Sequence, residues 1–306
     1  MELESRPSNI EDKITSSYRT ETIVNTLHQL DTSLNTLGID TYDLPNTKIL
    51  FKENEASNEG KENLLLGHVE VYPSKFEPVE IVYDKRFSTE EKEQIYLQEL
   101  HTRGIAYPGL QITLRHEFAH IAMWSITNQE RQAATRTIDE GWAKLVENTT
   151  ETLPIESTKQ ELKQLQITKP EIFNRCFDFK NVTTYEEKLN TAESRTGQAL
   201  LLWIHQEYGV EKMIELIQKS PEYQKRNDEL PKNKFEPTIL NKEMHKTYTE
   251  YYSLLNDIKL NKIPQDTVKS RLREIEGKQF EYALLETTNS LNINEVRDKF
   301  MKWING

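Results

Sequence analysis

Residues 108–124 have the sequence PGLQITLRHEFAHIAMW, which predicts a helix with two different faces. Pro108 suits the first turn of a helix, because the N–H that it lacks would have no partner there. Apolar residues then recur at helical spacing and predict a buried stripe, made of Leu110, Leu114, Phe118, Ile121 and Trp124. His116 and His120 stand one turn apart beside this stripe, about 6 Å along the axis and on one face. Two imidazoles placed in this way can bind one zinc ion from the same side.

A second stretch, DEGWAKLVE at residues 139–147, places carboxylates where they could complete such a site. Glu140 offers a hard oxygen ligand and would join the two histidines in a His, His, Glu set. Three protein ligands leave the fourth position open for water, as in catalytic rather than structural zinc sites. Glu117 is rotated off the ligand face, so its carboxylate could reach that water rather than the metal. We therefore expect one Zn²⁺ ion as the cofactor.

Together the two motifs resemble those of the gluzincins, the zinc metallopeptidases of the thermolysin and aminopeptidase N type. They are most similar to minimal peptidase MA-like domains, and the resemblance covers about residues 48–218. It implies that His116, His120 and Glu140 are the ligands and that Glu117 is the general base in the hydrolysis of peptide or protein substrates.

The resemblance also implies a supporting role for Glu147. In the aminopeptidase-like branch, an acidic residue seven positions after the ligand glutamate supports one of the histidines, and Glu147 has that position here. Glu147 lies two turns from Glu140 on the same helix face, where it could fix the tautomer of an imidazole. The alternative is an ordinary exposed carboxylate.

Residues 197–213 are similar to a later helix of these domains, with its Tyr-Gly end. Many relatives have an oxyanion-stabilising tyrosine three residues before the first glycine of this segment, whereas this chain has Ser194. Arg195, Tyr185 or His205 could take its place, although a histidine on an apolar helix, such as His205, is more often a packing residue.

The resemblance further implies that an edge strand before the motif helix binds the substrate backbone by strand addition. Val79, Ile81 and Tyr83 alternate as in a half-buried strand, and this strand is the candidate. An ordinary sheet strand is the alternative.

The remaining pattern predicts an α+β fold in which a small N-terminal sheet packs on the motif helices, followed by a mainly helical C-terminal region. Strands are expected at 48–51, 64–72 and 79–83, and helices at 23–37, 88–102, from 108, from 139, 192–209 and 210–218. From about residue 240 the chain is expected to be helical, with breaks near 264 and 289–294. The predicted domains are a mobile segment at 1–20, a catalytic domain at 21–220 and a helical subdomain at 221–306.

Composition narrows the classes of partner. A net charge of −11 argues against nucleic-acid binding.

No apolar run in the sequence is long enough for a membrane span. Cys176 is the single cysteine, which excludes an intrachain disulfide and a thiolate zinc cluster. The N-terminus lacks the pattern of a signal peptide, which leaves three alternatives: a cytoplasmic protein, export by a leaderless route, or a leader removed by cloning. The oligomeric state is not predicted.

Two other functions compete with the peptidase. One is a binding protein on the same fold that has weakened or lost turnover, which the serine at position 194 favours. The other is a helical interaction protein in which the His-Glu-x-x-His pentad arose by chance. Motifs of other enzyme classes are absent from the sequence, including Gly-x-Ser-x-Gly, Gly-Lys-Ser/Thr and Gly-x-Gly-x-x-Gly.

Overall fold

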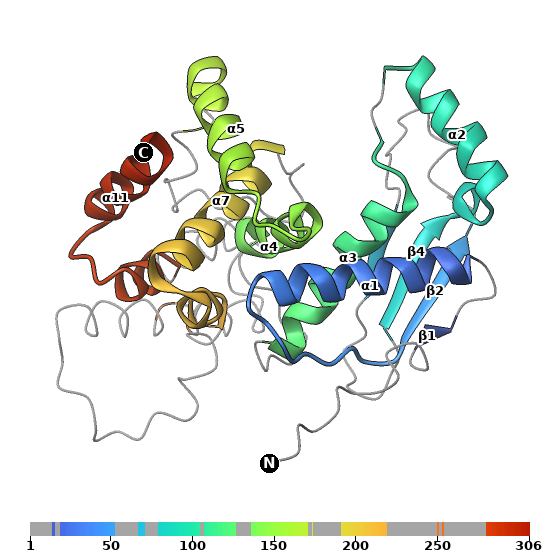
Figure 1. The fold of residues 1–306 in the computed structure, drawn as a ribbon, viewed down its shortest axis with the longest axis horizontal. Helices are drawn as coiled ribbons and strands as arrows, with labels where there is room; N and C mark the ends of the chain where they lie inside the picture. Colours follow the sequence, from blue (N-terminus) through green and yellow to red (C-terminus); the bar gives the residue numbers. More distant parts are fainter. Residues whose placement is uncertain are drawn as a thin grey trace, which may run out of the picture. The chain divides into compact units, whose positions relative to one another are not determined.

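The computed structural model describes residues 14–15, 19–52, 67–70, 79–104, 107–126, 136–170, 173, 191–218, 250, 253 and 280–306. Helices dominate this part of the chain and the strands lie in its first third (Figure 1). The named elements are β1 (Ile14–Thr15), α1 (Thr20–Thr36), β2 (Thr47–Lys52), β3 (Gly67–Glu70), β4 (Val79–Asp84), η3 (Lys85–Phe87), α2 (Glu90–Thr102), α3 (Leu110–Ile126), α4 (Arg136–Asn148), α5 (Ile155–Thr168), α7 (Thr191–Tyr208) and α11 (Ile293–Asn305). Residues 210–218 and 280–287 are also helical. The protein is therefore α+β, as the sequence predicts.

The chain forms two compact units, Met1–Arg131 with Val146–Leu153, and Gln132–Leu145 with Pro154–Gly306. The three predicted domains stay predictions, because their boundaries near residues 20 and 220 adjoin segments outside the described residues. None of the helices in the described ranges combines the length and the apolar character that a membrane crossing requires.

A four-stranded sheet in the first unit has the order β1-β2-β4-β3. β2 pairs in parallel with β1 and β4, whereas β3 runs antiparallel to β4. β4 therefore has a hydrogen-bonded neighbour on each side, and Val79, Ile81 and Tyr83 are not at an edge. The prediction that these three residues form the edge strand for substrate is wrong, because alternation of side chains reports which face is buried and not which strands are neighbours.

The burial of the β4 side chains agrees with the position of this strand in the interior of the sheet. Val82 and Asp84 are buried as well as Ile81 and Tyr83, so the second half of the strand is covered on both faces. Among the described strands, β1 and β3 form the two edges of the sheet, and β3 contacts α3.

α1, which the sequence predicts as a helix at 23–37, packs against α3. Its buried residues include Ile23, Leu27, Leu30 and Leu34. The helix ends at Thr36 with Leu37 as its C-cap, and Gly38 follows with a φ of 78° that suits a glycine; the Gly38 N–H donates to the Asn35 carbonyl at 2.9 Å.

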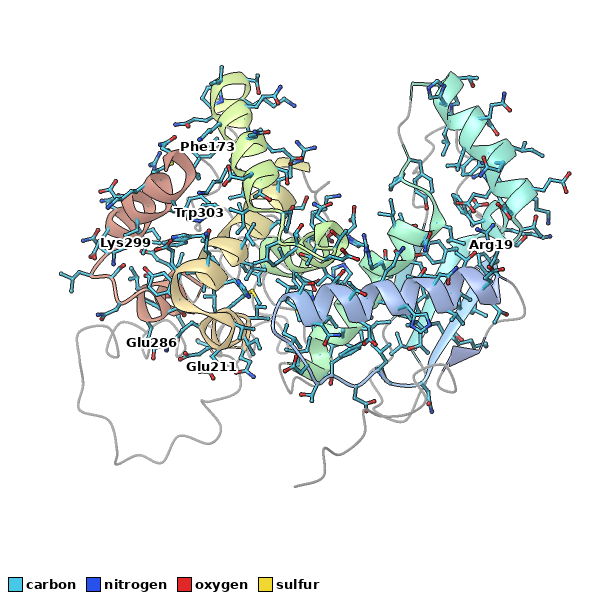
Figure 2. All side chains as sticks on the ribbon, in the orientation of Figure 1. Arg19, Phe173, Glu211, Glu286, Lys299 and Trp303 are labelled. Carbon is cyan, nitrogen blue, oxygen red and sulfur yellow. The ribbon has the colours of Figure 1, made fainter. Side chains whose placement is uncertain are left out.

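The start of α3 is fixed by a buried carboxylate. The helix begins at Leu110, two residues later than the Pro108 start that the sequence suggests, because Gly109 has a φ of 91° and cannot continue a right-handed helix. The Leu110 N–H donates to Glu93 Oε1 at 2.8 Å. The other oxygen of Glu93 is 2.7 Å from the guanidinium of Arg19, which Figure 2 labels. One buried carboxylate on α2 thus ties the beginnings of α1 and α3 together.

In the second unit, α5, α7 and α11 pack on one another. Trp203 of α7 meets Phe300 of α11 at 5.4 Å between ring centroids. The indole N–H of Trp303, labelled in Figure 2, donates to Gln206 at 2.5 Å. The sequence did not predict α5, because its buried stripe is narrow and includes a polar residue, Thr158. The break predicted at 289–294 is confirmed between the helix at 280–287 and α11.

α4 and α7 cross in direct backbone contact at Gly141 and Gly197. A Cβ atom on Gly197 would lie 2.0 Å from the carbonyl oxygen of Thr137 on α4. A Cβ on Gly141 would lie 2.4 Å from the carbonyl carbon of Gly197. Each position therefore requires glycine, because any side chain would overlap with backbone atoms of the facing helix.

Candidate metal site

α3 places the two histidines of the pentad beside each other. His116 and His120 have ring centroids 4.9 Å apart and planes at 80°. Both side chains are partly exposed, while Phe118, Ala119 and Ile121 are fully buried around them. Packing of the buried stripe fixes the orientation of α3. The two histidines therefore lie on a defined face of the helix, where they could bind a ligand.

α4 places Glu140 beside a buried apolar side of the helix, as α3 does for the two histidines. The helix begins at Arg136, three residues before the predicted start, and buries Ile138, Trp142 and Leu145. Glu140 is partly exposed beside this apolar side.

His116, His120 and Glu140 form a group that could hold a metal ion. Each offers one ligand atom, and these atoms all lie within 4.8 Å of one another. Two ligands on a tetrahedral zinc ion are about 3.4 Å apart, so small side-chain rotations would bring the three atoms to bonding positions. Two imidazoles and one carboxylate are a donor set that zinc accepts. The residues present therefore fit the expected cofactor.

Glu147 contacts His116 from the last turn of α4. His116 Nδ1 and Glu147 Oε2 are 3.1 Å apart, and their side chains are 20% and 11% exposed. A carboxylate at Nδ1 holds the proton on that nitrogen and leaves Nε2 as the lone-pair donor for a metal.

Arg115 is a residue of this site that the sequence analysis missed. Its side chain is buried, and its Nη2 donates to the main-chain carbonyl of Glu147. Burial lowers the pKa of the Arg115 guanidinium, and the nearby charge of Glu147 partly offsets that effect. A cation at the C-terminal end of α4 also meets the negative end of the helix dipole. In the sequence, the only signal for Arg115 is its position directly before His116. The sequence does not show that an arginine is buried, so this role could not be predicted from it.

Glu117 lies on α3 one residue after His116 and is partly exposed. It is not in the His, His, Glu group, as expected for a residue rotated off the ligand face. Its role as the general base stays a prediction.

Two of the three residues that could replace the missing tyrosine lie on α7. Ser194 and Arg195 lie in the first part of α7, and Arg195 Nε is 3.4 Å from Glu161 Oε2 of α5, with both side chains nearly half exposed. His205 lies in the last turn of α7. Tyr185 is outside the described residues. An oxyanion role for any of them stays a prediction.

The comparisons with known proteins identify no relative. No protein family, no curated protein and no solved structure matches this chain. The case for function therefore depends on the site itself.

Proposed function

We propose that this protein is a zinc-dependent metallopeptidase of the gluzincin type. The observation that carries the proposal is the gathering of His116, His120 and Glu140 within 4.8 Å, with Glu147 3.1 Å from His116. Chance can produce a His-Glu-x-x-His pentad, but it does not explain why a distant glutamate reaches the pair or why a second glutamate supports one histidine.

A zinc ion held by these three residues would lower the pKa of a water that it binds to about 7 and polarise the scissile carbonyl. The chain's own contribution to the reaction is made by Glu117. Its carboxylate accepts a proton from the attacking water as the new C–O bond forms. It then delivers this proton to the nitrogen of the leaving amine as the C–N bond breaks.

We place substrate binding at β3 instead of β4. A peptide in extended form could add to the outer edge of β3, using main-chain hydrogen bonds. This choice is supported by the strand order, in which β3 has a single neighbour among the described strands, and by the contact between β3 and α3.

The serine at position 194 favours a second candidate, a metal-binding protein of the same design that turns over slowly or not at all. Losing one oxyanion donor costs about 10²- to 10³-fold in rate, so this candidate predicts normal zinc binding and very slow cleavage.

The deciding experiment compares zinc content and peptide cleavage in the wild type and in Glu117→Gln, using a broad peptide mixture as substrate. We expect both proteins to bind one zinc ion, and the variant to lose about 10²- to 10⁴-fold in rate. Glu211→Gln is the matched control, because Glu211 is an exposed glutamate far from the pentad in sequence (Figure 2). Unchanged cleavage by Glu117→Gln would refute the general-base assignment, and a wild type without zinc would refute the site.

A further inference from the structure

The C-terminal end of α4 is held by side chains from two other helices. Arg115 of α3 donates from Nη2 to the main-chain carbonyl of Glu147, in the last turn of α4. Ser33 of α1 donates to the carbonyl of Thr149, directly after the helix, at 2.6 Å. All four residues belong to the first compact unit. Because the last carbonyls of a helix have no N–H partner within it, donors from outside the helix fix where it ends.

Capping a carbonyl does not by itself explain an arginine at position 115. Arg115 is 7% exposed, and its Nε is buried without a hydrogen-bond partner among the described residues. Ser33, which is fully buried, shows that a neutral hydroxyl can satisfy a carbonyl at the same helix end. Burying a guanidinium costs more free energy than burying a hydroxyl, because a charge loses more hydration. A buried group that is left partly unsatisfied in this way calls for a role.

The residue that Arg115 holds is also the one that contacts a candidate ligand. Glu147 Oε2 lies 3.1 Å from His116 Nδ1. Arg115 and His116 are neighbours on α3, so this helix contacts Glu147 twice, once at its carbonyl and once at its carboxylate. The first contact fixes the main chain of Glu147, and the second uses its side chain. A carboxylate fixed in this way can set the orientation of an imidazole.

We propose that Arg115 is a positioning residue of the metal site: it fixes the main chain of Glu147, so that the Glu147 carboxylate holds His116 in the orientation that binds zinc. Arg115 itself contacts neither metal nor substrate in this role. Its effect reaches the metal only through Glu147 and His116. The role rests on the zinc site of the proposed function and does not depend on peptide cleavage.

The direction of the change in zinc affinity separates positioning from simple electrostatics. A positive charge repels Zn²⁺, so removing the Arg115 charge would by itself strengthen binding and lower the Kd. Losing the orientation of His116 would weaken binding and raise the Kd. Contacts that orient a metal ligand commonly change metal affinity by about 10- to 100-fold. Since Arg115 acts through one such contact, we expect the lower end of this range.

A double-mutant cycle on the zinc Kd of the full-length protein tests the proposal. The variants are Arg115→Met, Glu147→Ala and their combination, measured by competition titration. We expect Arg115→Met to raise the Kd about tenfold in the wild-type background, and by less than about twofold where Glu147 is already replaced. An equal rise in both backgrounds would overturn the proposal, and so would a lower Kd in Arg115→Met.

Ser33→Ala is the matched control, because it removes a buried hydrogen bond to the same helix end at Thr149 instead of Glu147. It should lower the unfolding equilibrium stability about fivefold while changing the zinc Kd by less than about twofold. A rise in Kd as large as that of Arg115→Met would mean that any loosening of this helix end weakens the site, which would overturn the specific role of Arg115. If Arg115→Met does not fold, Arg115→Gln, which is also neutral and is too short for the same contact, replaces it with the same expectations.

A spectroscopic measurement separates this inference from the proposed function. In the metal-free protein at about pH 9, where a histidine of ordinary pKa is neutral, the ring ¹⁵N shifts of His116 show which nitrogen carries the proton. We expect the proton on Nδ1 in the wild type and in Ser33→Ala, and a mixture of both tautomers in Arg115→Met. An unchanged tautomer in Arg115→Met would overturn the positioning role. If the wild type binds no zinc or cleaves no peptide, the proposed function fails, and this measurement still decides the role of Arg115.

Discussion

Replacing Gly197 with alanine should destabilise the protein, although the same change in an ordinary helix stabilises it. Alanine in a helix interior is favoured over glycine by about 1 kcal/mol. Here, however, the new Cβ would lie 2.0 Å from the Thr137 carbonyl oxygen and 3.0 Å from Gly141 Cα, where an ordinary contact begins at 3.4 Å. Both neighbours are backbone atoms, so α4 and α7 would have to separate by about 1 Å.

Forced overpacking of this kind costs about 1–3 kcal/mol, and it outweighs the gain in helix propensity. With the gain in helix propensity subtracted, about 1–2 kcal/mol of destabilisation remains, and for a chain of this size we expect the Tm to fall by about 2–5 °C. Because Gly141 adjoins Glu140 on α4, the shift should also weaken zinc binding, by about tenfold in Kd.

Thermal unfolding and a zinc competition titration measure both effects. Glu207→Ala, on an exposed position of the same helix, is the control and should change the stability by less than about 0.5 kcal/mol. A Gly197→Ala protein as stable as the wild type, or more stable, would refute the close crossing of α4 and α7.

Three further predictions concern the metal and the charges. Glu147→Gln should raise the Kd for zinc by about 10- to 100-fold, because the amide orients His116 less firmly than the carboxylate 3.1 Å away; an unchanged Kd in a competition titration would contradict this. Chelation should lower the Tm, since zinc at 100 times its Kd adds about 2.7 kcal/mol to the stability; calorimetry with and without chelator checks it. Burial alone would raise the pKa of Asp84, but hydrogen bonds from the Arg86 side chain and N–H, together with its charge, lower it overall. Asp84 therefore stabilises the fold above its unfolded pKa of about 3.9, and this contribution is lost as the pH falls through the lowered pKa of the folded state. Urea unfolding at pH 7 and pH 3 should show a smaller acid loss in Asp84→Asn than in the wild type, and equal losses would exclude this role.

The sequence by itself determined the features that depend on neighbours along the chain. Helical spacing alone predicted the helix at α1, the common face of His116 and His120, and the buried stripe of α3 apart from Trp124, which is only partly buried. The expectation that Glu140 completes the group is confirmed as a His, His, Glu set that could hold a metal ion. These features are local because one helix turn brings residues three or four apart together, whatever the rest of the chain does.

Only the tertiary structure decided the features that depend on which elements meet. It placed β4 in the interior of the sheet, which the alternation of its side chains could not reveal. It brought Glu93 to the start of α3, and it put Arg115 against the carbonyl of Glu147. It also brought the backbones of Gly141 on α4 and Gly197 on α7 into direct contact. Contacts of this kind arise when separate elements pack into one core, and no periodicity within a single element encodes them.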